Sequence, residues 1–189
     1  MTLHRWQLVQ LGYVRRRYPL SDTPAAARHV RFALDDPLLR FWFRFVFPNT
    51  SHLAQMGPER TLRERIRPHL DAYCGSCFEA LCREALPHLY GREQVSASFE
   101  VGEYWDKRCQ VDVVGLRQDG WTDLGECRWG AGRVSRQARE DLESKVGLYP
   151  NRRNATIGRR IFTRDGPPRE RTRAGDPDVR WHDLADLYR

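Results

Sequence analysis

Residues 101–129, VGEYWDKRCQVDVVGLRQDGWTDLGECRW, decide the fold expected for this chain. Two stretches rich in β-branched and aromatic residues, 109–116 and 121–129, flank Asp119-Gly120, a dipeptide typical of a tight hairpin turn. Another strand is predicted just upstream, over residues 95–104. The region is therefore expected to form three consecutive antiparallel strands.

Helices are predicted on both sides of these strands. Residues 73–89 repeat apolar side chains at helical spacing, and residues 136–146 form a second candidate helix with Ser135 as its cap. A strand over 156–162, a loop over 164–178, a short strand over 179–182 and a terminal helical turn over 183–188 complete the pattern. The order helix, three strands, helix, strand predicts an α/β fold with a mixed sheet of α+β type.

Three polar residues of this region carry the candidate chemistry. Residues two apart in a strand point to the same face, so Glu126 and Arg128 project together, and Asp112 lies on the neighbouring strand. Adjacent strands are about 4.8 Å apart, close enough for two carboxylates to share a cation. Mg²⁺ is usually held by one or two carboxylates and waters, and it supports phosphoryl transfer. Glu79, on the preceding helix, is a third candidate ligand; the alternative is a plain ion pair of Asp112 and Glu126 with Arg128.

This placement resembles the PD-(D/E)xK nuclease superfamily, which has the restriction-endonuclease-like fold. The resemblance implies catalytic roles for Asp112, Glu126 and Arg128, with Mg²⁺ held by Glu79, Asp112 and Glu126. Arg128 stands where that superfamily has lysine. Arginine is larger and favours bidentate pairing with a carboxylate, so Arg128 is expected to compete with the metal and cleavage to be slow or absent. Lys145 is an alternative source of the lysine, although a position on the helix surface is the expected one.

A second resemblance covers nearly the whole chain. The stretches DDPLLRFWFRFVFPN (35–49), CFEALCRE (77–84), VGEYWDKRCQVDVVGL (101–116) and GECRWG (125–130) are similar to the C-terminal domain of archaeal-type AAA ATPases, known as domain of unknown function 234 (DUF234). In those proteins an ATPase domain precedes a winged helix and this nuclease-like domain. The resemblance therefore implies an ATPase module as a partner in cis or in trans. The chain has no G-x-x-x-x-G-K-[ST] phosphate loop, so no ATP site is expected within it.

The N-terminal third is expected to hold two smaller segments. A helix over 3–11 and strands over 13–18 and 29–34 look like the end of a winged helix, which would make the chain begin inside a domain. Asp36 and Pro37 are good starting residues for a nearly all-apolar helix that Pro48-Asn49 ends, and a short helix follows over 59–66. The predicted domains are a winged-helix remnant over 1–35, a helical connector over 36–69 and a restriction-endonuclease-like domain over 70–189.

Composition points to a polyanionic partner. The chain has 189 residues and a formal charge of +7, and only two of its 32 basic residues are lysine. Such a charge fits nucleic acid, although it also fits a charged surface or a biased base composition. The candidate phosphate contacts are Arg152, Arg153, Arg159, Arg160, Arg169, Arg171 and Arg173.

Targeting and cysteine patterns indicate the expected compartment. No signal peptide and no apolar run of bilayer length is apparent, so a cytoplasmic protein without membrane contact is expected. The five cysteines are then expected to be free thiols, and Cys74-x-x-Cys77 lacks the second ligand pair of a structural zinc site.

Three functions compete on these observations. The first is a metal-dependent nuclease, or a phosphodiester-binding domain derived from one, acting as an accessory domain of an ATPase. The second is a catalytically inactive interaction domain that docks on an ATPase module through the apolar helix over 38–47. The third is a DNA-binding module that uses Arg15, Arg16 and Arg17.

Overall fold

A computed structural model describes residues 3–23, 30–130, 134–165 and 178–188. The chain divides into two compact units. The first contains residues 1–18 and 27–73, and the second contains residues 19–26 and 74–189. The second unit carries the predicted site.

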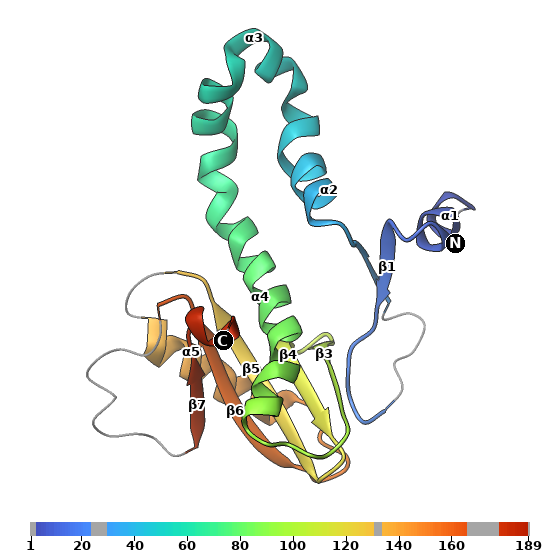
Figure 1. Cartoon of the computed structure of the whole chain (residues 1–189), viewed down its shortest axis with the longest axis vertical. Coiled ribbons are helices and arrows are strands. Elements are labelled where there is room, and N and C mark those ends of the chain that lie inside the picture. The colour runs from blue at the N-terminus through green and yellow to red at the C-terminus, as the bar shows by residue number, and fades with distance from the viewer. Residues whose placement is uncertain (1–2, 24–29, 131–133, 166–177, 189) are drawn as a thin grey trace. The chain divides into compact units, whose positions relative to one another are not determined.

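The second unit is built on a five-stranded mixed sheet (Figure 1). Strands β3 (Phe99–Trp105), β4 (Gln110–Arg117) and β5 (Trp121–Arg128) are consecutive and antiparallel. Strands β6 (Thr156–Thr163) and β7 (Val179–His182) extend the sheet in parallel with β5. The strand order is β3-β4-β5-β6-β7, which confirms the predicted mixed α/β sheet.

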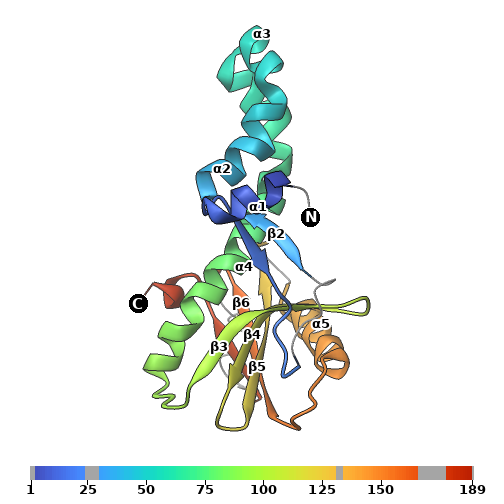
Figure 2. The ribbon, with the colours of Figure 1, turned by 90° about the vertical axis from the view of Figure 1, so that its right-hand side faces the viewer.

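One helix covers each face of the sheet, as Figure 2 shows. Helix α4 (Arg67–Arg92) packs Phe78, Cys82, Leu86 and Leu89 on one face. Helix α5 (Val134–Leu148) packs Ala138 and Leu142 on the other. The sheet is therefore the middle layer of three, and each face has its own apolar core.

Three glycines let large groups approach the face that α4 covers. A Cβ on Gly115 would lie 2.0 Å from the Tyr90 hydroxyl, and one on Gly125 would lie 2.9 Å from the Phe162 ring. A Cβ on Gly158 would lie 2.2 Å from Asp123 Oδ1. Real Cβ atoms do not approach other groups so closely, so this face depends on glycine at all three positions.

The hairpin turn and one bulge shape the antiparallel part of the sheet. Gly120 has φ +85°, the left-handed conformation that the Asp119-Gly120 pair predicts for this turn. On the other side, the β3–β4 register shifts between Gly102 and Tyr104, so Glu103 of β3 faces two residues of β4, Asp112 and Val113, which form a bulge. The bulge breaks the regular pairing next to the site.

The first unit begins with helix α1 (Leu3–Gln10) and a small antiparallel ribbon of β1 (Val14–Arg17) and β2 (Arg31–Leu34). Asp36 then caps helix α2 (Pro37–Phe41) by accepting the Leu39 N–H at 2.9 Å, as predicted. The helical path continues through a π-helical turn (Trp42–Val46) and a 3₁₀ turn (Phe47–Asn49).

The predicted end of this helical segment at Pro48-Asn49 is wrong. Helix α3 (Thr50–Thr61) follows at once, and a π-helical turn (Leu62–Ile66) leads into α4. Pro48 lies within the first turn of its short helix, where no N–H is needed, so it redirects the chain without ending the helical path. The real break is Gly57, with φ 77° and ψ 171°, a conformation open almost only to glycine.

Apolar residues of the first unit are unevenly covered. Phe45 is buried and packs against Phe41 and Tyr73, with ring centroids 5.1 and 5.2 Å away. Several large apolar side chains of the same helical segment remain exposed, namely Leu38, Trp42, Phe43, Phe47, Met56 and Leu62. So apolar a helix is expected either to be buried on several sides or to meet a partner, and the exposed side chains leave the second alternative as the prediction.

Some expectations fall outside the described part of the chain. The side chain of Ser135 and most of the 164–178 loop, including Arg169, Arg171 and Arg173, lie there. The five cysteines are free, as expected. None of the helices in the described ranges is both long and apolar enough to span a bilayer.

Candidate functional site

Asp112 and Glu126 lie side by side at one end of β4 and β5. They are one residue beyond the Val113–Gly125 register pair, so their side chains leave the sheet from neighbouring positions. Both carboxylates are buried. Asp112 Oδ2 accepts a hydrogen bond from the Cys127 backbone N–H at 3.0 Å, which fixes this carboxylate against the next strand.

Lys145 completes the cluster from helix α5. Its ammonium group hydrogen-bonds to Glu126 Oε2 and lies 3.9 Å from Asp112 Oδ2. The position of this lysine follows from the helix: Ala138 and Leu142 face the core, and Lys145 lies seven and three residues further on, on the same side. The expected surface position of Lys145 is therefore wrong, and its helical spacing from these two residues was the signal that could have shown it.

Arg128 also binds Glu126, from the opposite side. Its guanidinium donates to Glu126 Oε1 at 2.8 Å and to Asp141 of α5. The ion-pair alternative therefore holds for Glu126 and Arg128. Among the described residues, Asp112 forms no ion pair with Arg128, and both oxygens of Glu126 are covered by cations.

Further charged groups surround Asp112. Arg83 of α4 donates to the Asp112 backbone carbonyl at 2.7 Å and lies 3.8 Å from the carboxylate of Glu103, the buried residue opposite the bulge. Glu79 of α4 is half-buried, and burial and the charge of Asp112 raise its pKa. Glu103 and Arg83 were not among the candidates predicted from the sequence, because a bulge and a helix–strand contact leave no periodic pattern.

The described residues contain no group of three or more His, Cys, Asp or Glu side chains arranged to hold a metal ion. The carboxylates of Asp112 and Glu126 are close together, and Glu79 is near enough for the charge of Asp112 to raise its pKa. The role of Glu79 as a metal ligand stays a prediction.

The charge of one carboxyl group in this cluster, Glu126, changes near neutral pH. Burial and the neighbouring Asp112 charge raise the pKa of Glu126 to about 7, although Lys145 and Arg128 oppose the shift. Burial lowers the pKa of Lys145, but Asp112 and Glu126 outweigh it and raise the pKa overall. Lys145 therefore stays charged, and Glu126 holds or releases a proton near pH 7.

A comparison with sequence families matches residues 42–142, more than half of the chain, to the DUF234 family, described as "Archaea bacterial proteins of unknown function". The chain belongs to the DUF234 family. An uncharacterized protein of Methanocaldococcus jannaschii is 22% identical over 120 residues, which cover 63% of this chain and 26% of that protein. The DUF234 chain thus spans about a quarter of the length of that relative. No solved structure matches this chain.

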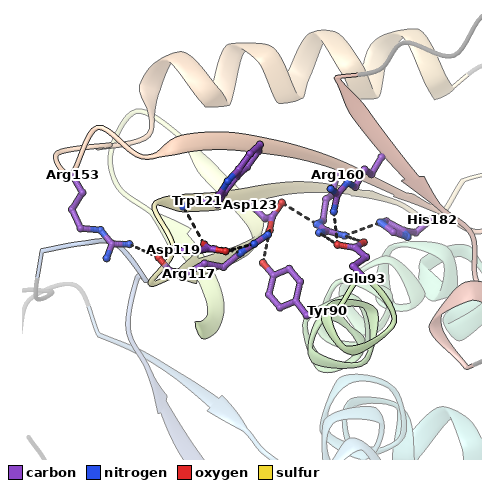
Figure 3. Close-up of polar contacts among 10 residues, drawn as sticks. Tyr90, Glu93, Arg117, Asp119, Trp121, Asp123, Arg153, Arg160 and His182 are labelled. Carbon is purple, nitrogen blue, oxygen red and sulfur yellow. Dashed lines mark hydrogen bonds and ion pairs between the residues drawn. The ribbon is translucent and has the colours of Figure 1, made fainter. Parts of the chain in front are cut away.

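The DUF234 chain has a second buried polar network, on the opposite face of the sheet (Figure 3). Arg160 of β6 is fully buried. Its guanidinium binds both carboxylate oxygens of Glu93, at 2.7 and 2.6 Å, and lies 3.1 Å from Asp123 Oδ1. The Tyr90 hydroxyl donates to Asp123 Oδ2 at 2.6 Å, and His182 Nε2 lies 3.2 Å from the guanidinium.

This network corrects the list of candidate phosphate contacts. Arg160 is enclosed by protein groups, so it cannot reach a nucleic acid backbone. Arg159, its neighbour in sequence, points the other way and pairs with Glu143 at 2.7 Å. Strand alternation explains the difference, because adjacent residues of β6 face opposite sides of the sheet.

His182 makes the stability of this DUF234 domain sensitive to acid. Burial and the Arg160 charge lower its pKa from 6.5 to about 4, against the charges of Glu93 and Asp186, while Arg92 adds to the lowering. The unfolded chain therefore binds more protons than the folded chain between pH 4 and 6.5. This contribution is fully present above pH 6.5 and is lost as the pH falls to 4, by about 3 kcal/mol.

Urea denaturation from pH 7 to pH 4 checks this expectation. His182→Gln keeps a polar side chain without a titrating ring, so its free energy of unfolding should fall less with acid than that of the wild type. The ion pairs of Glu93 are present in both proteins and cancel in the comparison. Equal pH slopes for the two proteins would contradict the role of His182.

Proposed function

We propose that the DUF234 domain is a restriction-endonuclease-like domain whose cluster of Asp112, Glu126 and Lys145 hydrolyses phosphodiester bonds with a divalent metal. The observation that carries the proposal is the position of the Lys145 ammonium, against Glu126 and beside Asp112 at the end of two adjacent strands. Two carboxylates and one lysine are thereby placed together, although the lysine comes from α5 and not from the strand.

The carboxylates fit a divalent ion in number and type. Asp112 and Glu126 would hold Mg²⁺, which usually takes one or two carboxylates and completes its shell with water. The raised pKa of Glu126 reflects two like charges in a buried place, which a cation would relieve. When bound, the metal polarises the phosphate and activates water. Arg128 would have to leave Glu126 Oε1, and Asp141 offers it a second carboxylate on which to remain.

The two cations have separable roles in this proposal. Lys145 orients the attacking water and offsets negative charge that develops on the phosphate. Arg128 covers Glu126 in the absence of metal, so it limits metal binding, as expected from its bidentate geometry. The role that a single lysine has in the PD-(D/E)xK superfamily is thus divided between two residues. Lys145 of α5 acts on the water and the phosphate, and Arg128 of β5 limits metal binding.

The partners follow from charge and family. The net charge of +7 favours nucleic acid as the substrate. Membership of DUF234 and the resemblance to the C-terminal domains of archaeal-type ATPases support an accessory role beside an ATPase module, in cis or in trans. The segment from α1 to β2 would then represent the end of a winged helix.

Metal binding and strand cleavage test the proposal together. Calorimetric titration with Mn²⁺ and a plasmid-nicking assay with Mg²⁺ or Mn²⁺ should show metal-dependent nicking that Asp112→Asn abolishes. Arg128→Lys should raise metal affinity about tenfold, because lysine cannot bridge Glu126 and Asp141 with a planar fork. Metal-independent nicking, or no metal binding by either the wild type or Arg128→Lys, would overturn the proposal.

A second candidate function is a non-catalytic interaction domain. The exposed apolar side chains Leu38, Trp42, Phe43 and Phe47 favour it, because one short helical segment that leaves four large apolar groups in solvent is typical of a contact surface. Absence of metal binding together with ATPase-module binding that Trp42→Ser and Phe43→Ser weaken would support this alternative.

A further inference from the structure

A cavity of about 510 Å³ opens at the end of the sheet away from Asp112 and Glu126. It lies where β5 and β6 begin and β7 starts, and its lining includes Trp121, Asp123, Gly158 and Arg180. Asp123 and Gly158 belong to the face that α4 covers, whereas Lys145 reaches Glu126 from α5. This cavity, called here the Gly158 pocket, is therefore separate from the proposed cleavage site.

The floor of the pocket is held open by its glycine. A Cβ at position 158 would lie 2.2 Å from Asp123 Oδ1 and 3.7 Å from the Trp121 ring, so any side chain would close the space between them. Asp123 itself is fixed by the Tyr90 hydroxyl and by Arg160. The floor is thus a bare strand backbone beside an immobile carboxylate.

The walls combine an aromatic ring with guanidinium groups. Trp121 is 40% exposed, and the guanidinium of Arg117 lies 5.9 Å from its ring centroid. Arg117 is held there by Asp119, as Figure 3 shows. One side of the indole is therefore backed by a fixed cation and the rest of the ring is available to a flat ligand.

Arg180 is the cation that is best placed to meet a ligand. Its side chain is 53% exposed, and Glu93 holds one of its nitrogens, Nη1. Among the described residues, its Nε and Nη2 have no hydrogen-bond partner. Arg117 and Arg159 also line the pocket, but Asp119 and Glu143 already bind their guanidinium groups, so Arg180 is the cation through which the pocket would bind an anionic group.

We propose that the Gly158 pocket binds a nucleoside monophosphate unit, with the base against Trp121 and the phosphate on Arg180. Aromatic side chains stack on any base, and guanidinium groups match phosphate oxygens bidentately. The cavity volume lies in the range of small-ligand sites, about 300 to 1,000 Å³. A polar lining disfavours an apolar ligand, and the exposed indole distinguishes the site from one for a bare anion.

This binding does not depend on phosphodiester cleavage. The residues that carry it touch neither Asp112 nor Glu126, so a catalytically inactive protein should bind equally well. The unit is either a free mononucleotide or the phosphorylated end of a strand, since both present one base and one phosphate.

Calorimetric titration of the full chain with AMP, adenosine and inorganic phosphate tests the proposal. AMP should bind, and both adenosine and phosphate should bind about tenfold more weakly, because each lacks one of the two contacts. Arg180→Ala and Trp121→Leu should each weaken AMP binding about tenfold, whereas Trp121→Phe retains an aromatic ring and most of the affinity. Arg136→Ala, on the exposed side of α5, is the matched control and should bind as the wild type does.

Competition by a 5′-phosphorylated single-stranded oligonucleotide separates the two sources. If the oligonucleotide displaces bound AMP at a lower concentration than further AMP does, the pocket binds strand ends. If the oligonucleotide does not displace AMP, the pocket binds free nucleotides. No AMP binding by wild type, equal binding of AMP and inorganic phosphate, or unchanged affinity in both Arg180→Ala and Trp121→Leu would overturn the proposal. Asp112→Asn should bind AMP normally, so loss of cleavage and loss of this site can be told apart.

Discussion

Lys145→Met is expected to slow metal-dependent strand cleavage about 100-fold, the effect of removing one preorganised donor from a charge-developing site. The substitution keeps the length of the aliphatic stem and removes only the ammonium group. Glu126 retains Arg128 as a partner, so the fold should persist. The same change should tighten Mn²⁺ binding, because a competing cation leaves Glu126 Oε2.

If Lys145 has this role, Lys145→Met should bind Mn²⁺ more tightly than the wild type and cleave more slowly. Initial nicking rates and Mn²⁺ titrations over a series of pH values measure the two quantities, because Lys145 lowers the pKa of Glu126 and its loss should raise that pKa. Lys145→Arg keeps the positive charge and should lose less activity than Lys145→Met. Unchanged cleavage by Lys145→Met would show that the ammonium group has only a structural part.

Arg160→Met is expected to destabilise the second unit by about 3 to 5 kcal/mol, the usual result of removing one partner from a buried ion pair. Without the guanidinium, Asp123 would remain buried with only the Tyr90 hydroxyl close to it and Arg117 Nη1 3.8 Å away. Glu93 would keep only its contact with Arg180. The penalty arises from the uncompensated carboxylates and not from lost packing, because methionine fills a similar volume.

Arg180→Ala provides the matched control for this prediction. Arg180 binds the same Glu93 carboxylate but is half-exposed, so its loss should change stability by about 0 to 1 kcal/mol. Urea denaturation at pH 7, followed by circular dichroism, gives the free energy of unfolding of each variant. Equal stability losses for Arg160→Met and Arg180→Ala would contradict the importance of burial in this network.

The sheet was predictable from sequence because its signals are local. The Asp119-Gly120 turn fixes the β4–β5 hairpin, and strand alternation then places Glu126 beside Asp112. The position of Lys145 needed the helix to be docked on the sheet, which depends on the packing of Ala138 and Leu142. Helical spacing could place Lys145 on the side of α5 that faces the sheet, but which strand residues it meets there is a tertiary property that no local pattern specifies.

The misplaced arginines and helix ends have different causes. Arg160 follows another arginine in β6, and charge alone suggested an exposed position. Its side chain is buried on the face that α4 covers, and only the neighbouring Glu93 and Asp123 make this burial tolerable. In the first unit, Pro48 is compatible with helical structure on its C-terminal side, so proline did not mark an end there. Gly57 was the better marker of a break, through its backbone conformation.

The bulge between β3 and β4 and the shortness of β7 also govern how the sheet ends. Among the described residues, β3 and β7 are the outer strands. The bulge increases the twist beside β3, and Leu20 covers part of that strand, because its N–H donates to the Glu103 carbonyl at 2.7 Å. Strand β7 offers only four residues, with the charged Arg180 among them. These features make it hard for a strand of another molecule to add to the sheet, so they protect the domain from edge-to-edge aggregation at high concentration.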